Sequence, residues 1–425
     1  MDAGRWIARD EAVVWHGFTQ MSAYADNAPV IVDRAERREL IDVDGKRYLD
    51  AISSLWVTTL GHRIPELDEA LTRQLGRVAH STLLGNGNSV VIEFAEALAA
   101  VVPVDRPHVL FASDGASAVE QALKIAFQYW ANLGESGRTH YLAFGDAYHG
   151  DTVGSLSLGG GGFGTEIFDP LRFPVLRAPG FDDPDSLHVA AGIVKERAHE
   201  LAAVVVEPLV QGAAGMKVAP PDAFRPLQDA CAETGVLLVC DEVATGFGRT
   251  GTLFASERCR LSPDLLCLGK GITGGYLPMS ATVAARRVYD AFLGDDLGPR
   301  TFYHGHSYGG NALAAAVALR HLQLIEEWDV LGNVAARSAQ LQALVDGRIA
   351  KHRLVKEVRL VGLMCGIELH PGLKRGRRVA GACVRRGVLI RSLGDVVVVM
   401  PPLTITEGEI ERIVDALDDA LGDIT

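Results

Sequence analysis

Several features that mark whole classes of protein are missing from this sequence of 425 residues. None of the six cysteines forms a Cys-x-x-Cys pair, so we expect buried free thiols in a reducing compartment, not disulfides or zinc ligands. No apolar stretch approaches the ~18 residues of a membrane helix, and the first residues lack the apolar core of a secretion signal. These absences predict a cytoplasmic protein with no membrane partner.

An excess of positive charge is missing as well. The formal net charge is −12, and the densest basic run, at 374–378, is interpreted as a solvated surface segment. A nucleic-acid partner is therefore not expected, because binding to phosphate backbones requires a basic surface.

What the sequence does contain is a globular pattern, with 48% hydrophobic and 22% charged residues. From about 90 to 285, continuous apolar strands alternate with helical patterns, for example the strand His108–Ala112 and the helix Ser117–Asn132. Such alternation predicts an α/β domain with a mainly parallel sheet. Later patterns, a helix over Ala312–Trp328 and one strand over Leu360–Leu369, suggest a smaller α+β domain. The expected parts are an N-terminal segment (1–60) that joins the small domain, a large domain (61–325) and the small C-terminal domain (326–425).

Two polar residues follow buried apolar strands. Lys270 lies between glycines just after the run Leu265–Leu268, and Asp241 follows the run Val236–Cys240, 29 positions earlier (270 − 241). Because ligands bind at the carboxyl ends of parallel strands, we expect this amine and this carboxylate in one crevice. Pyridoxal phosphate (PLP) requires such a pair, a lysine to form a Schiff base and an acid to face the pyridine nitrogen. The sequence therefore predicts a PLP site.

Neighbouring segments supply candidates for the rest of that site. Gly115 lies in the segment 113–117 that joins a strand to a helix, where free N–H groups at the helix start can bind a phosphate; an ordinary N-cap is the alternative. Tyr148 could stack on a flat ring, or it could cap the core as a turn aromatic. Val243 lies two residues beyond Asp241 and could cover the other face of the ring.

Other patterns are weaker. Residues 246–251 match G-x-G-x-x-G, but no helix clearly opens there, so a dinucleotide site is rejected. His304 and His306 have no acidic or thiol partner nearby in sequence, and no metal is predicted. Ser307 suits a phosphate contact. Arg391 is either a surface charge or, in a cleft, a clamp for a carboxylate.

The motifs taken together resemble a known family. The run from Asp241 to Gly251, the glycines around Lys270 and the pair Glu207–Pro208 are typical of class III, fold-type I PLP aminotransferases. Further segments are similar to one branch, the 7,8-diaminopelargonic acid synthases, which convert 8-amino-7-oxononanoate to 7,8-diaminononanoate in biotin biosynthesis. Those segments are 53–56, 80–84, 127–130, 148–152, 210–216 and 400–402. The resemblance covers essentially the whole chain and implies the fold and the reaction of that branch.

The resemblance also implies a role for each matching residue. Lys270 would be the Schiff-base lysine and proton shuttle, and Asp241 would face the pyridine nitrogen. Arg391 would receive a substrate carboxylate. His306 and Ser307 would contact the phosphate in a partner subunit, which implies a homodimer with shared sites. The other expected contacts are Gly115, Ala116, Tyr148 and Val243 on the cofactor, and Leu55, Trp56, Tyr148 and Gly305 on the substrate.

Some positions depart from that branch. Leu55 stands where a second tryptophan is frequent, Phe18 where a tyrosine is common, and Asp114 where a serine is usual. The amino donor stays open between S-adenosylmethionine and lysine, with a preference for lysine because segments 305–308 and 391–395 are similar to the lysine-using enzymes. Two alternatives remain: another class III aminotransferase acting on ω-amino acids, and a catalytically silent module of the PLP fold.

Overall fold

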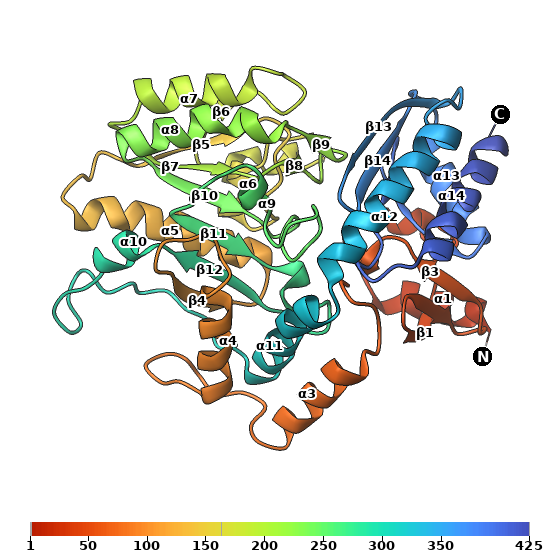
Figure 1. Ribbon diagram of the computed structural model, residues 1–425, viewed down its shortest axis with the longest axis horizontal. Coiled ribbons are helices and arrows are strands. Elements are labelled where there is room, and N and C mark those ends of the chain that lie inside the picture. Colours follow the sequence, from red (N-terminus) through yellow and green to blue (C-terminus); the bar gives the residue numbers. More distant parts are fainter. Residues whose placement is uncertain (1, 163, 425) are drawn as a thin grey trace.

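The computed structural model describes residues 2–162 and 164–424. Figure 1 shows a large sheet flanked by helices on the left and a smaller group of strands and helices on the right. The long helix α11 (Ala312–Glu327) and helix α12 (Val330–Leu344) connect the two regions.

The large sheet has seven strands in the order β4-β12-β11-β10-β7-β5-β6. Neighbours from β11 to β6 are parallel, whereas β12 runs antiparallel to both β11 and β4. The strands are β4 (His108–Ala112), β5 (His140–Phe144), β6 (Leu176–Ala178), β7 (Leu201–Val206), β10 (Leu237–Asp241), β11 (Leu265–Leu268) and β12 (Ser280–Ala284).

Both faces of this sheet are covered, because alternate residues of its strands enter two different apolar cores. Val204 and Leu238 belong to one core, while Val205 and Val239 belong to the other, with helix α5 (Gly115–Asn132). Burial on both faces is why the strands are continuous apolar runs, as the sequence indicated. The remaining helices of this region are α3 (Pro65–Leu75), α4 (Ser89–Ala99), α6 (Val153–Leu158), α7 (Ser186–Glu196), α8 (Arg225–Thr234), α9 (Ala255–Arg258) and α10 (Arg286–Asp290).

The smaller region combines the two ends of the chain. Strand β15 (Val388–Leu389) pairs in parallel with β3 (Arg47–Asp50), so residues more than 300 positions apart are neighbours. A second sheet has the order β13-β14-β17-β16. The other elements are α1 (Ala3–Val13), β1 (Val32–Glu36), β2 (Glu39–Asp42), α2 (Ser53–Trp56), β13 (Val355–Val361), β14 (Met364–Leu369), α13 (Arg375–Arg385), β16 (Arg391–Leu393), β17 (Val396–Val399) and α14 (Glu407–Gly422).

The structure corrects one sequence-based expectation. The single strand predicted over Leu360–Leu369 is wrong, because β13 and β14 form an antiparallel hairpin that turns at Gly362 and Leu363. The basic run at 374–378 lies at the start of helix α13, and Lys374, Arg377 and Arg378 are exposed, as expected of a surface segment. All six cysteines are buried and unpaired, as predicted. No helix in the described ranges has the length and apolarity needed to span a bilayer.

Candidate active site

A cavity of about 450 Å³ opens at the carboxyl ends of β10 and β11. The two strands are parallel, with Asp241 opposite Cys267, so the residues that follow them emerge at one edge of the sheet. Asp241 ends β10, and Lys270 begins the short 3-10 helix η5 (Lys270–Thr273) just after β11. Both side chains line the cavity, together with Trp56, Gly115, Ala116, Tyr148, His149, Glu207 and Val243.

Burial controls the amine of Lys270. It lowers the pKa of this group below its ordinary value of 10.5, although the charges of Asp241 and Glu207 act in the opposite direction. Lys270 Nζ lies 5.0 Å from the ring centroid of Trp56. Because a neutral amine is the nucleophilic form, this shift favours the form of Lys270 that can attack a carbonyl carbon.

The carboxylate of Asp241 is held by two partners. Its Oδ2 lies 2.7 Å from His149 Nδ1, and its Oδ1 accepts a hydrogen bond of 3.1 Å from the backbone N–H of Val243. The side chain of His149 is fully buried. This pair fixes the direction in which Asp241 faces the cavity.

A second buried carboxylate lies on the same cavity. Glu207 accepts backbone N–H bonds from Tyr148 and Gly212, each of 3.2 Å. Burial, reinforced by the nearby charge of Asp241, raises the pKa of Glu207 to about 7. The Tyr148 hydroxyl donates to Asp151 at 2.9 Å, and burial together with this bond raises the pKa of Tyr148.

The amino end of α5 forms another wall. The Asp114 carboxylate is the N-cap of this helix, because it accepts bonds from the backbone N–H and the hydroxyl of Ser117 at 2.9 and 2.8 Å. The first-turn N–H groups of Gly115 and Ala116 have no acceptor inside the helix. A Cβ on Gly115 would lie 2.5 Å from Val243, so only glycine fits beside that side chain. This end of the cavity suits an anion.

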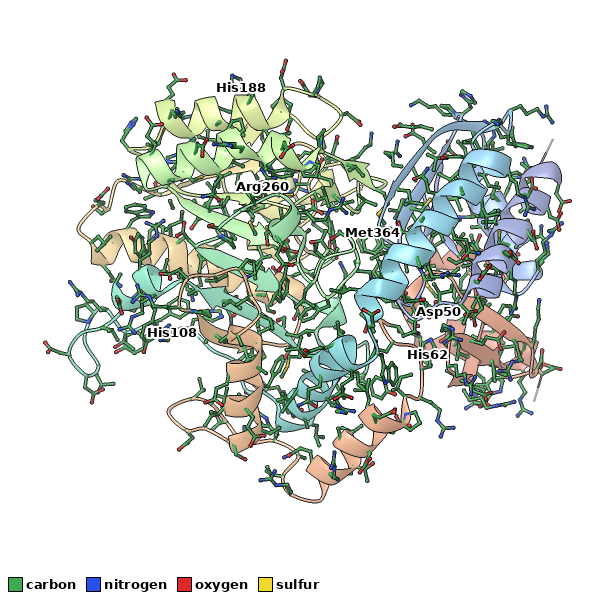
Figure 2. The ribbon with its side chains drawn as sticks, viewed as in Figure 1. Asp50, His62, His108, His188, Arg260 and Met364 are labelled. Atoms are coloured by element: carbon green, nitrogen blue, oxygen red, sulfur yellow. The ribbon has the colours of Figure 1, made fainter. Side chains whose placement is uncertain are left out.

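Trp56 reaches the cavity through an unusual turn. All four residues of Ser53–Trp56 have positive φ angles, between 52° and 86°. Such conformations cost about 1–3 kcal/mol each and persist only when the surroundings enforce them. Asp50 accepts two bonds from Ser54, each of 3.0 Å, and Ser53 donates to the carbonyl of Met400 at 2.6 Å. Figure 2 shows His62 beside Asp50, and their side chains are 2.9 Å apart.

Five predicted residues do not line this cavity in the single chain. Leu55 is 46% exposed. His306 and Ser307 belong to a loop in which the Ser307 carbonyl lies 2.6 Å from His80 Nε2. Arg391 instead lines a separate hollow of about 590 Å³ beside α13. Gly305, in the same loop as Ser307, packs against Leu84: a Cβ there would lie 2.7 Å from that side chain.

With the geometry in view, the chain can be compared with known proteins. The family model described as "Aminotransferase class-III" matches residues 20–421. The chain belongs to the class III aminotransferases. The family and the α/β fold class predicted from the sequence are thereby confirmed, and the protein is an aminotransferase.

This class III aminotransferase has curated relatives along its whole length. It is 48% identical to a protein of Nitratidesulfovibrio vulgaris, with 98% of this chain and 81% of the relative covered. It is 39% identical to a protein of Geobacter sulfurreducens, with coverages of 98% and 97%. Both relatives are named adenosylmethionine-8-amino-7-oxononanoate aminotransferase.

Solved structures agree with this placement. The crystal structure of the enzyme of the same name from Methanocaldococcus jannaschii matches with a TM-score of 0.96 and 37% identity, covering 100% of both chains. An amine transaminase from an uncultivated Pseudomonas species, in its PLP-bound form, matches with a TM-score of 0.91 and 34% identity, covering 97% of this chain and 99% of its own.

Class III aminotransferases work with PLP, and the residues of this cavity fit that group. The amine, the carboxylate and the anion-binding helix end surround one space, as PLP requires. Two buried nitrogen atoms of lining residues, His149 Nε2 and Trp56 Nε1, have no hydrogen-bond partner among the described residues. A bound molecule would supply partners for them.

Sequence reasoning missed two residues of this aminotransferase site. His149 follows Tyr148 directly in the segment 148–152, but the sequence does not reveal its bond to Asp241, 92 positions away. Glu207 belongs to the quoted Glu–Pro pair, and only the fold shows that its side chain enters the cavity.

Proposed function

We propose that this protein is a PLP-dependent aminotransferase that converts 8-amino-7-oxononanoate to 7,8-diaminononanoate in biotin biosynthesis. The observation that carries the proposal is the agreement between two independent findings. The curated relatives that match nearly the whole chain act, by name, on this substrate. The cavity places Trp56 5.0 Å from the reactive amine, where an aliphatic substrate can pack.

When bound, PLP supplies an aldehyde that accepts an amino group and a ring that withdraws electrons from the reacting carbon. The residues of the chain do the rest. Lys270 would hold the cofactor through its amine and, once released, would take and return the proton at the carbon that carries the transferred nitrogen. Asp241 would keep the ring nitrogen protonated, and His149, bonded to Asp241, orients that carboxylate. Gly115 and Ala116 would hold the phosphate, and Tyr148 and Val243, which also line the cavity, would hold the ring.

The substrate side rests on Trp56. This residue is 7% exposed and lines the cavity, where its indole ring offers a flat apolar surface to the methylene chain of an oxononanoate. Each methylene that leaves water contributes about 0.8 kcal/mol. A long aliphatic substrate therefore gains more from this wall than a short ω-amino acid such as β-alanine does.

The amino donor is the finer question. The names of the curated relatives include adenosylmethionine, which supports S-adenosylmethionine as the donor. The sequence-based preference was for lysine. We propose S-adenosylmethionine as the donor and keep lysine as the alternative that the experiment below distinguishes.

We further propose that the enzyme acts in the cytoplasm as a homodimer with shared active sites. In the single chain, His306 and Ser307 lie outside the Lys270 cavity, and the loop that carries them exposes Tyr303 and Tyr308, with 66% and 65% of their surface accessible. A second subunit would cover these rings and bring the loop to its partner's cofactor. Light scattering of the purified protein tests the stoichiometry.

A half-reaction assay tests the reaction. The purified enzyme is loaded with PLP and mixed with S-adenosylmethionine or with lysine, and the absorbance of the cofactor is followed in single turnover. The amino form is then chased with 8-amino-7-oxononanoate. Conversion by S-adenosylmethionine and recovery by 8-amino-7-oxononanoate support the proposal. Recovery by semialdehyde or keto acid substrates alone would assign the enzyme to the ω-amino acid aminotransferases instead.

A further inference from the structure

The segment Gly212–Met216 forms a turn between β8 (Val210–Gln211) and β9 (Lys217–Val218) at one wall of the cavity. Ala213 lines the cavity, and the N–H of Gly212 donates to Glu207 Oε1 at 3.2 Å. A Cβ on Gly212 would lie 3.4 Å from the ring of Trp56, so the indole stands within about one methyl group of this backbone. The position of this turn therefore affects two residues that face the substrate.

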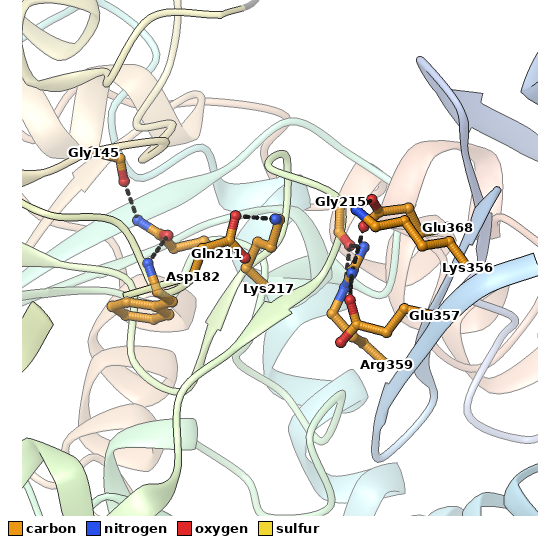
Figure 3. A network of polar contacts seen from close by, with 10 residues as sticks. Gly145, Asp182, Gln211, Gly215, Lys217, Lys356, Glu357, Arg359 and Glu368 are labelled. Atoms are coloured by element: carbon orange, nitrogen blue, oxygen red, sulfur yellow. Dashed lines mark hydrogen bonds and ion pairs between the residues drawn. The ribbon is translucent and has the colours of Figure 1, made fainter. Parts of the chain in front are cut away.

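The turn is held from the small region by one arginine. Arg359, on β13, donates from Nε and Nη2 to the carbonyl oxygen of Gly215, at 3.1 and 2.9 Å (Figure 3). Its Nη1 donates to Glu357 and Glu368, both at 2.6 Å. The residue is 8% exposed, so its guanidinium is desolvated and its fork geometry is fixed.

The backbone itself shows how close this contact is. Gly215 has a φ of +95°, and a Cβ there would lie 2.9 Å from Val396. A Cβ on Gly366, in β14, would lie 2.8 Å from the carbonyl oxygen of Gly215. The sheet β13-β14-β17-β16 thus packs directly on the turn, with no room for a side chain between them.

The other end of the turn is also fixed. Gln211 accepts the N–H of Phe181 at 3.0 Å and donates to the carbonyl of Gly145 at 2.8 Å (Figure 3). Because Gln211 anchors the turn to the large sheet and Arg359 anchors it to the small sheet, a change at Arg359 moves the end that contacts the small region.

We propose that Arg359 is a positioning residue for the substrate: through the Gly215 carbonyl it sets the place of the turn Gly212–Met216, and hence of Glu207 and Trp56. The identity of the substrate rests on the proposed function, whereas the mechanical link between Arg359 and the turn does not. A residue that only stabilised the contact between the regions would affect folding without affecting substrate binding selectively.

The test compares two variants with matched controls in the PLP-loaded enzyme. Arg359→Lys keeps the charge but cannot make the forked bond to Gly215. Gly215→Ala disturbs the same bond from the other partner. The controls are Arg348→Lys, which alters an exposed fork to Asp415 and Asp418, and Gly45→Ala, at a glycine of φ +84° with open space around it.

Two readouts are measured. Hydrogen exchange of the amides in 209–219 should quicken in both variants and stay unchanged in both controls. The KM for 8-amino-7-oxononanoate should rise about tenfold while kcat changes less than about twofold, since the lost contact serves binding in the ground and transition states alike. The rise in KM of the double variant, Arg359→Lys with Gly215→Ala, should be smaller than the product of the two single rises, because both changes disturb the same bond.

Unchanged exchange and unchanged KM in Arg359→Lys would overturn the proposal, and so would equal changes in the controls. If this variant does not fold, it is replaced by Glu357→Ala, which removes one acceptor of Arg359 Nη1; the same changes in exchange and KM are expected, at smaller size. The exchange measurement needs no substrate. If the enzyme fails to use 8-amino-7-oxononanoate but exchange in 209–219 still responds to Arg359, the proposed function fails, while the mechanical link between Arg359 and the turn stands.

Discussion

His321 gives a sharp prediction about pH and stability. This histidine lies on α11 with none of its surface exposed, and its Nε2 is 2.6 Å from the hydroxyl of Thr59. It packs against the segment after Lys270, since a Cβ on Gly274 would lie 3.1 Å from its ring. Burial, together with the positive charge of Arg249, lowers the pKa of His321 from 6.5 to about 4.

The magnitude follows from that shift. A change from 6.5 to about 4 corresponds to about 3 kcal/mol, at about 1.4 kcal/mol for each pH unit. Because the unfolded chain binds this proton more readily than the folded protein, the contribution is complete above pH 6.5 and is lost as the pH falls towards 4. By about pH 5 the loss amounts to about 2 kcal/mol.

The variant His321→Gln removes the titrating group and keeps an amide near Thr59. Between about pH 7.5 and pH 5, the free energy of unfolding of the unaltered protein should fall by about 2 kcal/mol more than that of the variant. Denaturant titrations at one protein concentration measure both, so that subunit association does not differ between samples. Exposed His188 on α7, replaced in the same way, is the control. The reasoning would be refuted if the free energies of unfolding of the unaltered protein and of His321→Gln changed by the same amount between these pH values.

Three further outcomes are expected. Lys270→Ala should abolish multiple-turnover transamination while the protein stays folded; retained turnover excludes the role given to this amine. Arg391→Ala should raise the KM for carboxylate substrates far more than it weakens PLP binding. An unchanged KM would exclude the hypothesis that Arg391 binds a substrate carboxylate. Asp50→Ala removes the acceptor of both bonds from Ser54 and of the bond from His62, and should lower the free energy of unfolding by about 3 kcal/mol. Thermal unfolding checks this, with the exposed Asp33→Ala as the control that should change little.

That Asp241 and Lys270 line one cavity was predictable from the sequence for a physical reason. Strands buried on both faces are continuous apolar runs, so the ends of β10 and β11 can be located without a structure. Parallel strands bring those ends to one edge, and Asp241 and Lys270 meet there. Trp56, by contrast, came from the family resemblance alone. Its place depends on a turn with four positive φ values, which no local pattern predicts.

Two parts of the fold escaped prediction because local patterns there are ambiguous. Leu360–Leu369 is apolar on both sides of Gly362, so the run gives no sign of a reversal; only the φ of +56° at that glycine reveals the hairpin. Helix α12 follows α11 after a short break at Trp328 and Asp329, and the sequence analysis placed no helix there.

The cavity also shows why the protonation of Lys270 could not be predicted from its neighbours in sequence. Burial favours the neutral form of any titrating group, so it lowers the pKa of the Lys270 amine and raises that of the Glu207 carboxyl to about 7. The two shifts have one cause and opposite signs. Two carboxylates beside an amine would by charge alone keep it protonated, and here burial outweighs them. Burial of the residue that follows β11 therefore shifts Lys270 towards its neutral, nucleophilic form, against the charges of the two carboxylates.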